Sequence, residues 1–333
     1  MRRLLPLLLL PAVALSACGD SGRAGQSSRA PATPPSARAE APVRVGGVPV
    51  AVAVGESGVW VLDQARARLT RHDPESGRRS GSPAPVGSSP IALAVGEGWM
   101  WVLDGADGVQ RVDPSTGRPS GEPVAVPDPN GIAVAAGAVW VTSRAGRSVT
   151  RIDAATLRRD PPIKVGAGPA DVVFADDGVW VAEADAGSVS RIDARTRKIS
   201  RSLRLGPGQV LALAAGDGAL FAAVAKTELN DDVQLVRIDP KTAKVNGAPI
   251  PVPGGVPLQL AAGSGSVWLT DVGSSLPGSP ARAPALLRID HSRGSAVPVV
   301  EMTGRPSSVA AVSGAVWVTD STRGTLTRVT LGR

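Results

Sequence analysis

Short apolar runs alternate with turn-forming residues along most of the chain. The runs are about five residues long, rich in valine, and bounded by glycine, proline, aspartate or asparagine, a composition typical of β-strands. No helical period appears after the first residues of the chain. The pattern therefore predicts an all-β protein.

The apolar runs belong to a longer repeat of roughly forty residues. The stretch VWVLDQARARLTRHDPESG at 59–77 returns as MWVLDGADGVQRVDPSTG at 100–117, and again at 139–157 and 179–197. Trp60, Trp101, Trp140 and Trp180 are 41, 39 and 40 residues apart; Phe221, Trp268 and Trp317 follow after 41, 47 and 49. Each is followed by an Arg-x-Asp triplet or its remnant, at Arg71, Arg111, Arg151, Arg191, Arg237, Arg288 and Arg328. The chain thus holds seven copies.

A complete copy contains four predicted strands. In the second copy they begin at Ile91, Met100, Gly108 and Glu122. Four short antiparallel strands make one blade, and a closed ring of blades removes the sheet edges that would otherwise aggregate. The sequence predicts a seven-bladed β-propeller over residues 42–333.

The two ends of the repeat predict how the ring closes. The last copy stops at Arg333 without a fourth strand, and an unpaired strand at about residues 42–46 precedes the first copy. We expect this N-terminal strand to complete the last blade.

The residue types within a copy predict what each strand packs against. The first strand is mostly valine and alanine, as in 50–54 and 132–135. We expect both of its faces to be buried between neighbouring blades near the axis. The tryptophan of the second strand supplies bulk where the gap between blades widens.

The repeat resembles that of a known family. A unit reading VWVT…GSVSRIDPxTG…VGxxPxGIAV is similar to the YVTN-type and streptogramin-lyase-like seven-bladed propellers, and the resemblance covers residues 43–333. It is specific for fold and weak for function, since the family includes a lyase as well as proteins without known chemistry.

The N-terminus reads as an export signal. Arg2 and Arg3 precede an apolar run that is too short and too rich in proline to cross a bilayer, which predicts a signal peptide over 1–17. Leu15-Ser16-Ala17-Cys18 resembles the lipobox of bacterial lipoproteins, which implies that Cys18 is lipidated. Cys18 is the only cysteine, so no internal disulfide can form. The sequence leaves Sec and Tat export both open.

Residues 18–41 hold mainly glycine, serine, alanine, proline and arginine. This composition predicts a disordered tether between lipid and propeller. The formal net charge of the chain is +7, without a basic block, so we expect no nucleic-acid partner.

Aspartate and histidine residues near the turns have mainly structural interpretations. Asp113-Pro-Ser-Thr-Gly and its equivalents are expected to form the turn between the third and fourth strands, with calcium ligation as the alternative. The resemblance implies catalytic histidines, an acid and magnesium in the lyases. Here His72 replaces an apolar residue of the triplet and His291 lies in a turn, so no position matches the lyase histidines.

The second strand ends in an acid in five copies, which makes these acids the candidate binding face. The carboxylates are expected to cap the adjoining turns or to form a ring that attracts cations. They are Asp63, Asp104, Glu183, Asp271 and Asp320. The fifth and sixth copies also have longer loops between the second and third strands, at 225–232 and 272–284. These insertions either build a surface for a partner or reflect neutral drift in tolerant loops.

The sequence lacks a cysteine and histidine cluster for zinc, a phosphate-binding glycine loop and a nucleophile elbow. We expect a monomeric, non-catalytic binding or scaffold module without a cofactor, anchored through Cys18 to the outer face of the bacterial cytoplasmic membrane or the periplasmic side of the envelope. Its partner would be an envelope protein, a cell-wall polymer or a small ligand. The alternatives are a metal-assisted lyase or hydrolase and a ligand-sensing partner of a membrane kinase.

Overall fold

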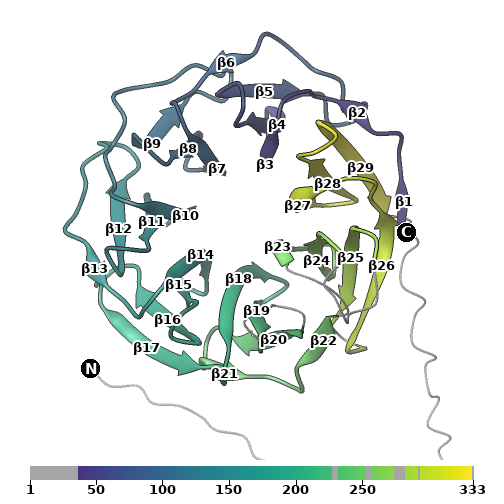
Figure 1. The fold of residues 1–333 in the computed structure, drawn as a ribbon. Coiled ribbons are helices and arrows are strands. Elements are labelled where there is room, and N and C mark those ends of the chain that lie inside the picture. The colour runs from purple at the N-terminus through teal and green to yellow at the C-terminus, as the bar shows by residue number, and fades with distance from the viewer. Residues whose placement is uncertain (1–36, 227–231, 253–256, 274–281, 292, 332–333) are drawn as a thin grey trace, which may run out of the picture. The chain divides into compact units, whose positions relative to one another are not determined.

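The computed structural model describes residues 37–226, 232–252, 257–273, 282–291 and 293–331. Within these residues the chain forms strands β1 to β29 and no helix. The strands make seven antiparallel sheets arranged around a central axis (Figure 1). The prediction of an all-β, seven-bladed β-propeller is therefore confirmed. The described part of the chain contains no helix of the length and apolarity needed to span a membrane.

The strands run outward from the axis in chain order within each blade. Blade 1 comprises β3 (Pro49–Gly55), β4 (Gly58–Asp63), β5 (Arg68–His72) and β6 (Ala84–Pro85), and blade 2 comprises β7 (Pro90–Gly96), β8 (Trp99–Asp104) and β9 (Gly108–Val112). Blade 3 comprises β10 (Pro129–Ala135), β11 (Ala138–Ser143), β12 (Ser148–Asp153) and β13 (Ile163–Lys164). Blade 4 comprises β14 (Pro169–Ala175), β15 (Gly178–Glu183), β16 (Ser188–Asp193) and β17 (Ile199–Arg204). Blade 5 comprises β18 (Gln209–Gly216), β19 (Ala219–Ala225), β20 (Val233–Asp239), β21 (Lys244–Val245) and β22 (Ile250–Val252). Blade 6 comprises β23 (Pro257–Gly263), β24 (Ser266–Asp271), β25 (Ala285–Asp290) and β26 (Ser295–Glu301). Blade 7 comprises β27 (Pro306–Val312), β28 (Ala315–Asp320) and β29 (Thr325–Leu331), and the N-terminal strands β1 (Ala37–Ala39) and β2 (Val43–Arg44) complete it.

The outermost strand of blade 2 is shorter than the sequence predicts. The run from Glu122 forms only a bridge between Val124 and Val109, which exchange two backbone hydrogen bonds of 2.8 and 2.9 Å. Pro123 and Pro127 flank this bridge, and neither has an N–H group to extend the ladder.

The ring closes through the N-terminal strand, as the sequence predicts. Val43 of β2 pairs with Leu326 of β29, and Arg44 pairs with Thr325. The propeller also begins earlier than expected, because β1 pairs with β29 inside the segment 18–41 that was assigned to the tether. Arg38 and Thr330 lie opposite each other there, and Arg328 forms an ion pair of 3.0 Å with Glu40.

The core consists of one apolar cluster at each boundary between blades. The tryptophan or phenylalanine of every second strand is at most 3% exposed and belongs to the cluster that its blade shares with the next one. Trp140, for example, packs against Val179, Val181 and Ile192 of blade 4. The predicted role of the tryptophans is confirmed.

The prediction that the first strands are buried on both faces is wrong. The second strands are the most buried ones, with every residue of β8 after Trp99 buried, whereas β7 is only half-buried along most of its length. The reason is that the ring leaves an open channel at its axis, and side chains of the first strands line it. Small residues are needed there to let seven strands meet.

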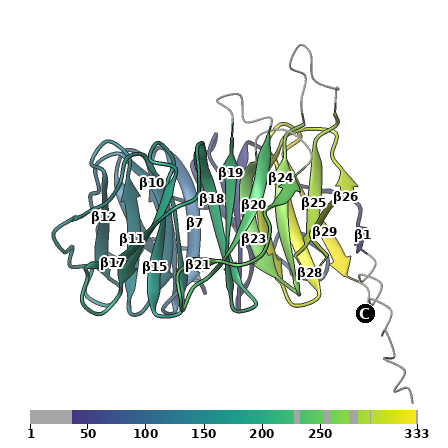
Figure 2. The same ribbon diagram turned by 90° about the horizontal axis from the view of Figure 1, so that it is seen from below.

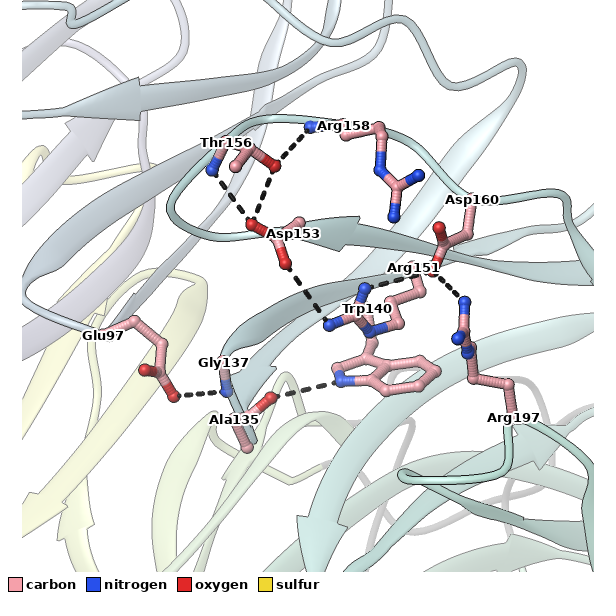
Figure 3. A network of polar contacts seen from close by, with 10 residues as sticks. All are labelled: Glu97, Ala135, Gly137, Trp140, Arg151, Asp153, Thr156, Arg158, Asp160 and Arg197. Carbon is pink, nitrogen blue, oxygen red and sulfur yellow. Dashed lines mark hydrogen bonds and ion pairs between the residues drawn. The ribbon is translucent and has the colours of Figure 1, made fainter.

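Aspartates after the third strands hold the turns to the fourth strands. In blade 3 the N–H of Thr156 donates to Asp153 Oδ1 (2.9 Å), while Arg151 reaches Asp160 (3.0 Å), as Figure 3 shows. Asp160 also accepts from Arg197 of blade 4 (2.9 Å) and so links the two blades. Hydrogen bonds from the N–H and hydroxyl of Thr156 lower the pKa of Asp153. The turn motif is thus structural in this blade, as expected.

Candidate functional site

The channel opens into a cavity of about 540 Å³, which we call the channel mouth. It lies on the face that carries the turns between second and third strands and the loops between blades, which we call the mouth face. The opposite face carries the other turns and is called the turn face. All seven blades contribute to the channel mouth, through residues such as Val50, Ile91, Asn130, Asp171, Leu211, Gln259 and Ser307.

A β-bulge near the start of each first strand aims side chains into the channel mouth. The register shifts between Pro49 and Ala51 in blade 1 and at the equivalent point of every other blade. The residue between the shifted pairs lines the cavity in blade 1 as Val50 and in blade 7 as Ser307. A bulge turns one residue away from the ladder, which is how a wall of strands presents specific groups.

Polar side chains at four of the bulges tie a blade to the next one. Gln259 Oε1 accepts from Val309 N–H (2.9 Å), Ser308 Oγ accepts from Val52 N–H (3.0 Å), and Asp171 Oδ2 accepts from Leu213 N–H (2.8 Å). In blade 3, Asn130 Nδ2 donates to Ala170 O (2.6 Å). These bonds fix the wall of the channel mouth, so its polar groups are held in place before any ligand arrives.

Asp171 is the acidic group of the channel mouth. Burial raises its pKa to about 6, against the opposing effect of the hydrogen bonds from Leu213 and Val172. Arg305 is the basic residue of the same wall, and Ser321 adds a hydroxyl. With Ile91, Leu93 and Leu211 between them, these groups form a surface suited to a ligand with both polar and apolar parts.

The five acids of the candidate binding face lie around the channel mouth, and each is engaged within its own blade. They are buried, with at most 5% exposed. Asp104 accepts from Ser89 N–H (2.7 Å) and from Ala106 and Asp107 N–H (2.8 and 3.0 Å), and Asp320 accepts from Arg305, Thr322 and Arg323 N–H. Asp104 and Asp320 therefore each join the loop between blades to the turn after the second strand.

The other three acids make related contacts. Asp63 accepts from Val48 N–H (3.0 Å) and pairs with Arg66; Glu183 accepts from Gly166 N–H (2.7 Å) and Ser188 hydroxyl (2.5 Å); Asp271 accepts from Gly273 N–H and pairs with Arg282. The structure does not bring the five carboxylates together. Among the described residues no three His, Cys, Asp or Glu side chains lie close enough to hold a metal ion.

Glycines make room for these carboxylates. A Cβ atom on Gly166 would overlap the carboxylate of Glu183, and one on Gly304 would overlap that of Asp320. Neither glycine has a positive φ, so close approach alone requires glycine at these positions. The Val-Gly element of the repeat is thus explained by the acid that follows it in the same blade.

Both histidines lie on the turn side of the ring and not in the channel mouth. His72 is 1% exposed, with Nδ1 2.9 Å from Gly77 O and Nε2 3.0 Å from the Thr70 hydroxyl. Because a carbonyl can only accept, Nδ1 carries the proton, and burial lowers the pKa of this side chain. His291 follows β25 and contacts the ring of Phe221 at 5.3 Å between centroids.

The two lengthened loops are described only at their bases. Lys226 N–H donates to Asp232 O (2.9 Å) in blade 5, and Asp271 holds Gly273 and Arg282 in blade 6. Residues 227–231 and 274–281 lie outside the described residues. Both loop bases belong to the mouth face, as Figure 2 shows from the positions of β19 and β24.

The bulge residues are the site residues that the sequence analysis missed. Their signal is the proline that starts six of the seven first strands, since the lining residues follow it by one or two positions. The acids were singled out because they recur, but recurrence here reflects a structural need. Residues that differ between copies, such as Asn130, Asp171 and Gln259, line the channel mouth instead.

No protein-family model and no curated protein matches the chain. Several solved structures match the chain in fold. A catalytically inactive histidine-to-alanine variant of virginiamycin B lyase from Staphylococcus aureus, with quinupristin, has a TM-score of 0.72 at 16% identity, covering 89% of this chain and 99% of that one. The Neurospora crassa Pan2 WD40 domain has a TM-score of 0.64 at 10% identity (85% and 89%), and U3-55K one of 0.69 at 12% (90% and 100%). The chain thus shares the seven-bladed propeller fold with virginiamycin B lyase and WD40 domains.

Proposed function

We propose that this protein is an exported, lipid-anchored β-propeller that binds a ligand or partner at the channel mouth and performs no catalysis. The sequence Leu15-Ser16-Ala17-Cys18 supports the anchor, which would hold the protein at the outer face of the bacterial cytoplasmic membrane or the periplasmic side of the envelope. Two acyl chains on one residue suffice for stable attachment.

One observation carries the binding role. The channel mouth is an open cavity of about 540 Å³ whose wall combines fixed polar groups from several blades with apolar side chains. Its volume lies within the range of small-molecule sites, and it would also admit a short segment of a protein or polymer. The acids around it stiffen the loops, so the ring acts as a rigid frame for recognition.

A photoreactive side chain in place of Ser321 tests this role in the native envelope. We expect a discrete crosslinked product from Ser321, and its loss when Leu211→Trp fills the channel mouth. The matched control places the same photoreactive side chain at Ala155, on the turn face. Equal products from both positions, or a product that survives Leu211→Trp, would contradict binding at the channel mouth.

The anchor has its own test. Cells fed an alkyne-bearing fatty acid should label the protein, and Cys18→Ser should abolish the label and release the protein from the membrane fraction. Labelling that persists in Cys18→Ser would place the lipid elsewhere and overturn this part of the proposal.

The similarity to virginiamycin B lyase favours one second candidate, a metal-assisted lyase or hydrolase. Both histidines lie away from the channel mouth, so such an activity would need to work without a histidine, through groups such as Asp171, Arg305 and Ser321. Incubation with quinupristin and Mg²⁺, followed by mass spectrometry, decides between the two. Turnover that is lost in Asp171→Asn would replace the binding proposal with the enzymatic one.

A further inference from the structure

Five consecutive blades place a basic side chain at the same point of the turn face. Each follows the left-handed residue that ends the turn after the third strand, and each is exposed. We call these residues the basic rim: Arg78, Arg118, Arg158, Lys198 and Lys244. They are about forty residues apart in sequence, which is why the chain shows no basic block.

The turns fix the backbone at the basic rim. The N–H groups of Arg78, Arg118 and Arg158 donate to the hydroxyls of Ser76, Thr116 and Thr156 (3.3–3.4 Å). The acids of the turns between first and second strands on this face, such as Glu56, Glu97 and Asp217, lie nearer the axis. The turns of the basic rim also carry acids, namely Asp73, Glu75, Asp113, Asp153, Asp193 and Asp239. Exposed basic residues outnumber them there, because Arg79, Arg159, Arg195, Arg197 and Lys241 add to the five residues of the rim.

A cavity between blades 3 and 4 adjoins the basic rim at Arg158. It measures about 720 Å³ and is lined by Arg151, Arg158, Arg195 and Arg197 together with Asp153, Asp177 and Asp193. Asp160 holds Arg151 and Arg197 in place (Figure 3). Guanidinium groups in such a hollow suit the phosphate of a lipid headgroup.

The N-terminal chain joins the propeller on this same face. Strand β29 ends there, and Ala37 pairs with its last described residue, Leu331, whereas Val43 pairs near its start. The chain therefore enters at the turn face and runs toward the mouth face along blade 7. Residues 19–36 separate Cys18 from β1, and a chain of that length spans at most about 60 Å.

From these two observations we propose that the turn face docks on an anionic phospholipid bilayer. The proposal rests on the lipid anchor proposed above for its biological setting. The attachment at blade 7 and the basic rim on blades 1–5 would together hold the whole turn face toward the membrane. The channel mouth then faces away from the lipid, open to a partner.

Vesicle co-sedimentation tests the surface without the anchor. Residues 35–333 form one compact unit, so a soluble protein of this range, which has no cysteine, can be used. We expect binding to vesicles containing one-third phosphatidylglycerol, weak binding to pure phosphatidylcholine, and loss of binding at about 0.5 M salt because the attraction is screened. Equal binding to both vesicles, or none to either, would overturn the proposal.

A charge-matched pair of variants separates the basic rim from overall charge. Replacing all five rim residues by glutamine should weaken binding at least about tenfold, since each basic residue near an anionic surface contributes about fivefold. The control replaces five exposed basic residues at the mouth end of the strands, Arg44, Arg68, Arg147, Lys164 and Arg204. We expect the control to lose less than about threefold. Equal losses would show that only net charge matters and would contradict a defined docking face.

Orientation is read from two single-cysteine variants in blade 3. A fluorophore on Ala155→Cys, at the turn face, should be quenched by spin-labelled lipid, and one on Ala145→Cys, at the mouth face, should not. The reverse pattern, or binding to soluble polyphosphate in place of vesicles, would overturn membrane docking. Because this protein lacks Cys18, failure of the anchor proposal leaves these results unaffected.

Discussion

Val43 and Leu326 lie opposite each other in the outer ladder of blade 7, which joins the two ends of the propeller in one sheet. The pairing continues along β29 at β1, where Ala37 meets Leu331. Glu40 adds an ion pair to Arg328, whose guanidinium lies 5.9 Å from the centre of the Trp317 ring. The N-terminal segment is therefore part of the folded propeller and not only a connection to it.

Removing that segment should open the ring. A protein starting at Gly47 loses β1 and β2 and leaves the edge of β29 unpaired, so we expect its free energy of unfolding to fall by roughly 3 kcal/mol or more. A protein starting at Pro35 is the control and should match the full chain. Urea unfolding measures both, and equal stability of the two truncations would contradict closure by this segment.

The tryptophans between blades should dominate stability. Trp180 is fully buried and packs on Leu220, Ala222 and Ile238 of blade 5, so Trp180→Ala should cost about 4 kcal/mol through the cavity it leaves. Trp99 is the matched control, because it is partly exposed, packs at the edge of the cluster between blades 2 and 3, and stacks with Arg111 at 4.2 Å. Trp99→Ala should cost at most about 1 kcal/mol. Thermal unfolding of both variants checks the difference.

The repeat predicted the architecture well because the packing that holds a propeller is itself repeated. Trp60 and its equivalents meet the same surroundings in each blade, and the strand count and ring closure follow from their spacing. The burial of the first strands was mispredicted for a related reason. Valine and alanine are favoured both between packed sheets and beside a narrow open channel, and the pattern alone does not separate the two.

The channel mouth could not be predicted in the same way. Its wall depends on bulges that shift the register by one residue, and a bulge has no composition of its own beyond the preceding proline. Asp171 stands where other copies have alanine, glycine, glutamine or serine, so only the structure shows that it faces the axis and bonds to blade 5. The basic rim was missed because its members come together only when the ring closes.

The pairing of glycine with acid predicts a measurable coupling. Gly166→Ala should destabilise the protein by about 1–3 kcal/mol, because the new methyl group overlaps the Glu183 carboxylate. In a Glu183→Ala background the same change should cost much less. A double-mutant cycle measured by urea unfolding should therefore show a coupling of about 1 kcal/mol or more. Additive effects would mean that the loop shifts to relieve the overlap.

One turn should allow a substitution that raises the free energy of unfolding. Ala136 and Gly137 form the two-residue loop between β10 and β11, with φ of 53° and 68°. Both values are left-handed, and asparagine tolerates this region better than alanine does. Ala136→Asn should raise the free energy of unfolding by about 0.5–1 kcal/mol. Ala155→Asn, in a turn without a positive φ at that residue, is the control and should change stability little.

Asp171 should make stability depend on pH in a direction opposite to that of the turn aspartates. Its pKa is about 6 in the folded protein and 3.8 in an unperturbed aspartate, so between these values the folded state binds more protons than the unfolded one. Stability should therefore fall as pH rises through this window and level off above it, by at most about 3 kcal/mol.

The variant Asp171→Asn isolates this effect from the turn aspartates, whose pKa values are lowered and whose stabilising effect is lost on acidification. The amide oxygen can still accept from Leu213 N–H, while the ionisation is gone. Relative to the parent protein, Asp171→Asn should have similar stability near pH 4 and greater stability near pH 7.5, because only the parent then carries the buried charge. Urea unfolding at both pH values gives the comparison, and a difference between the proteins that stays constant with pH would show that Asp171 does not titrate in this window.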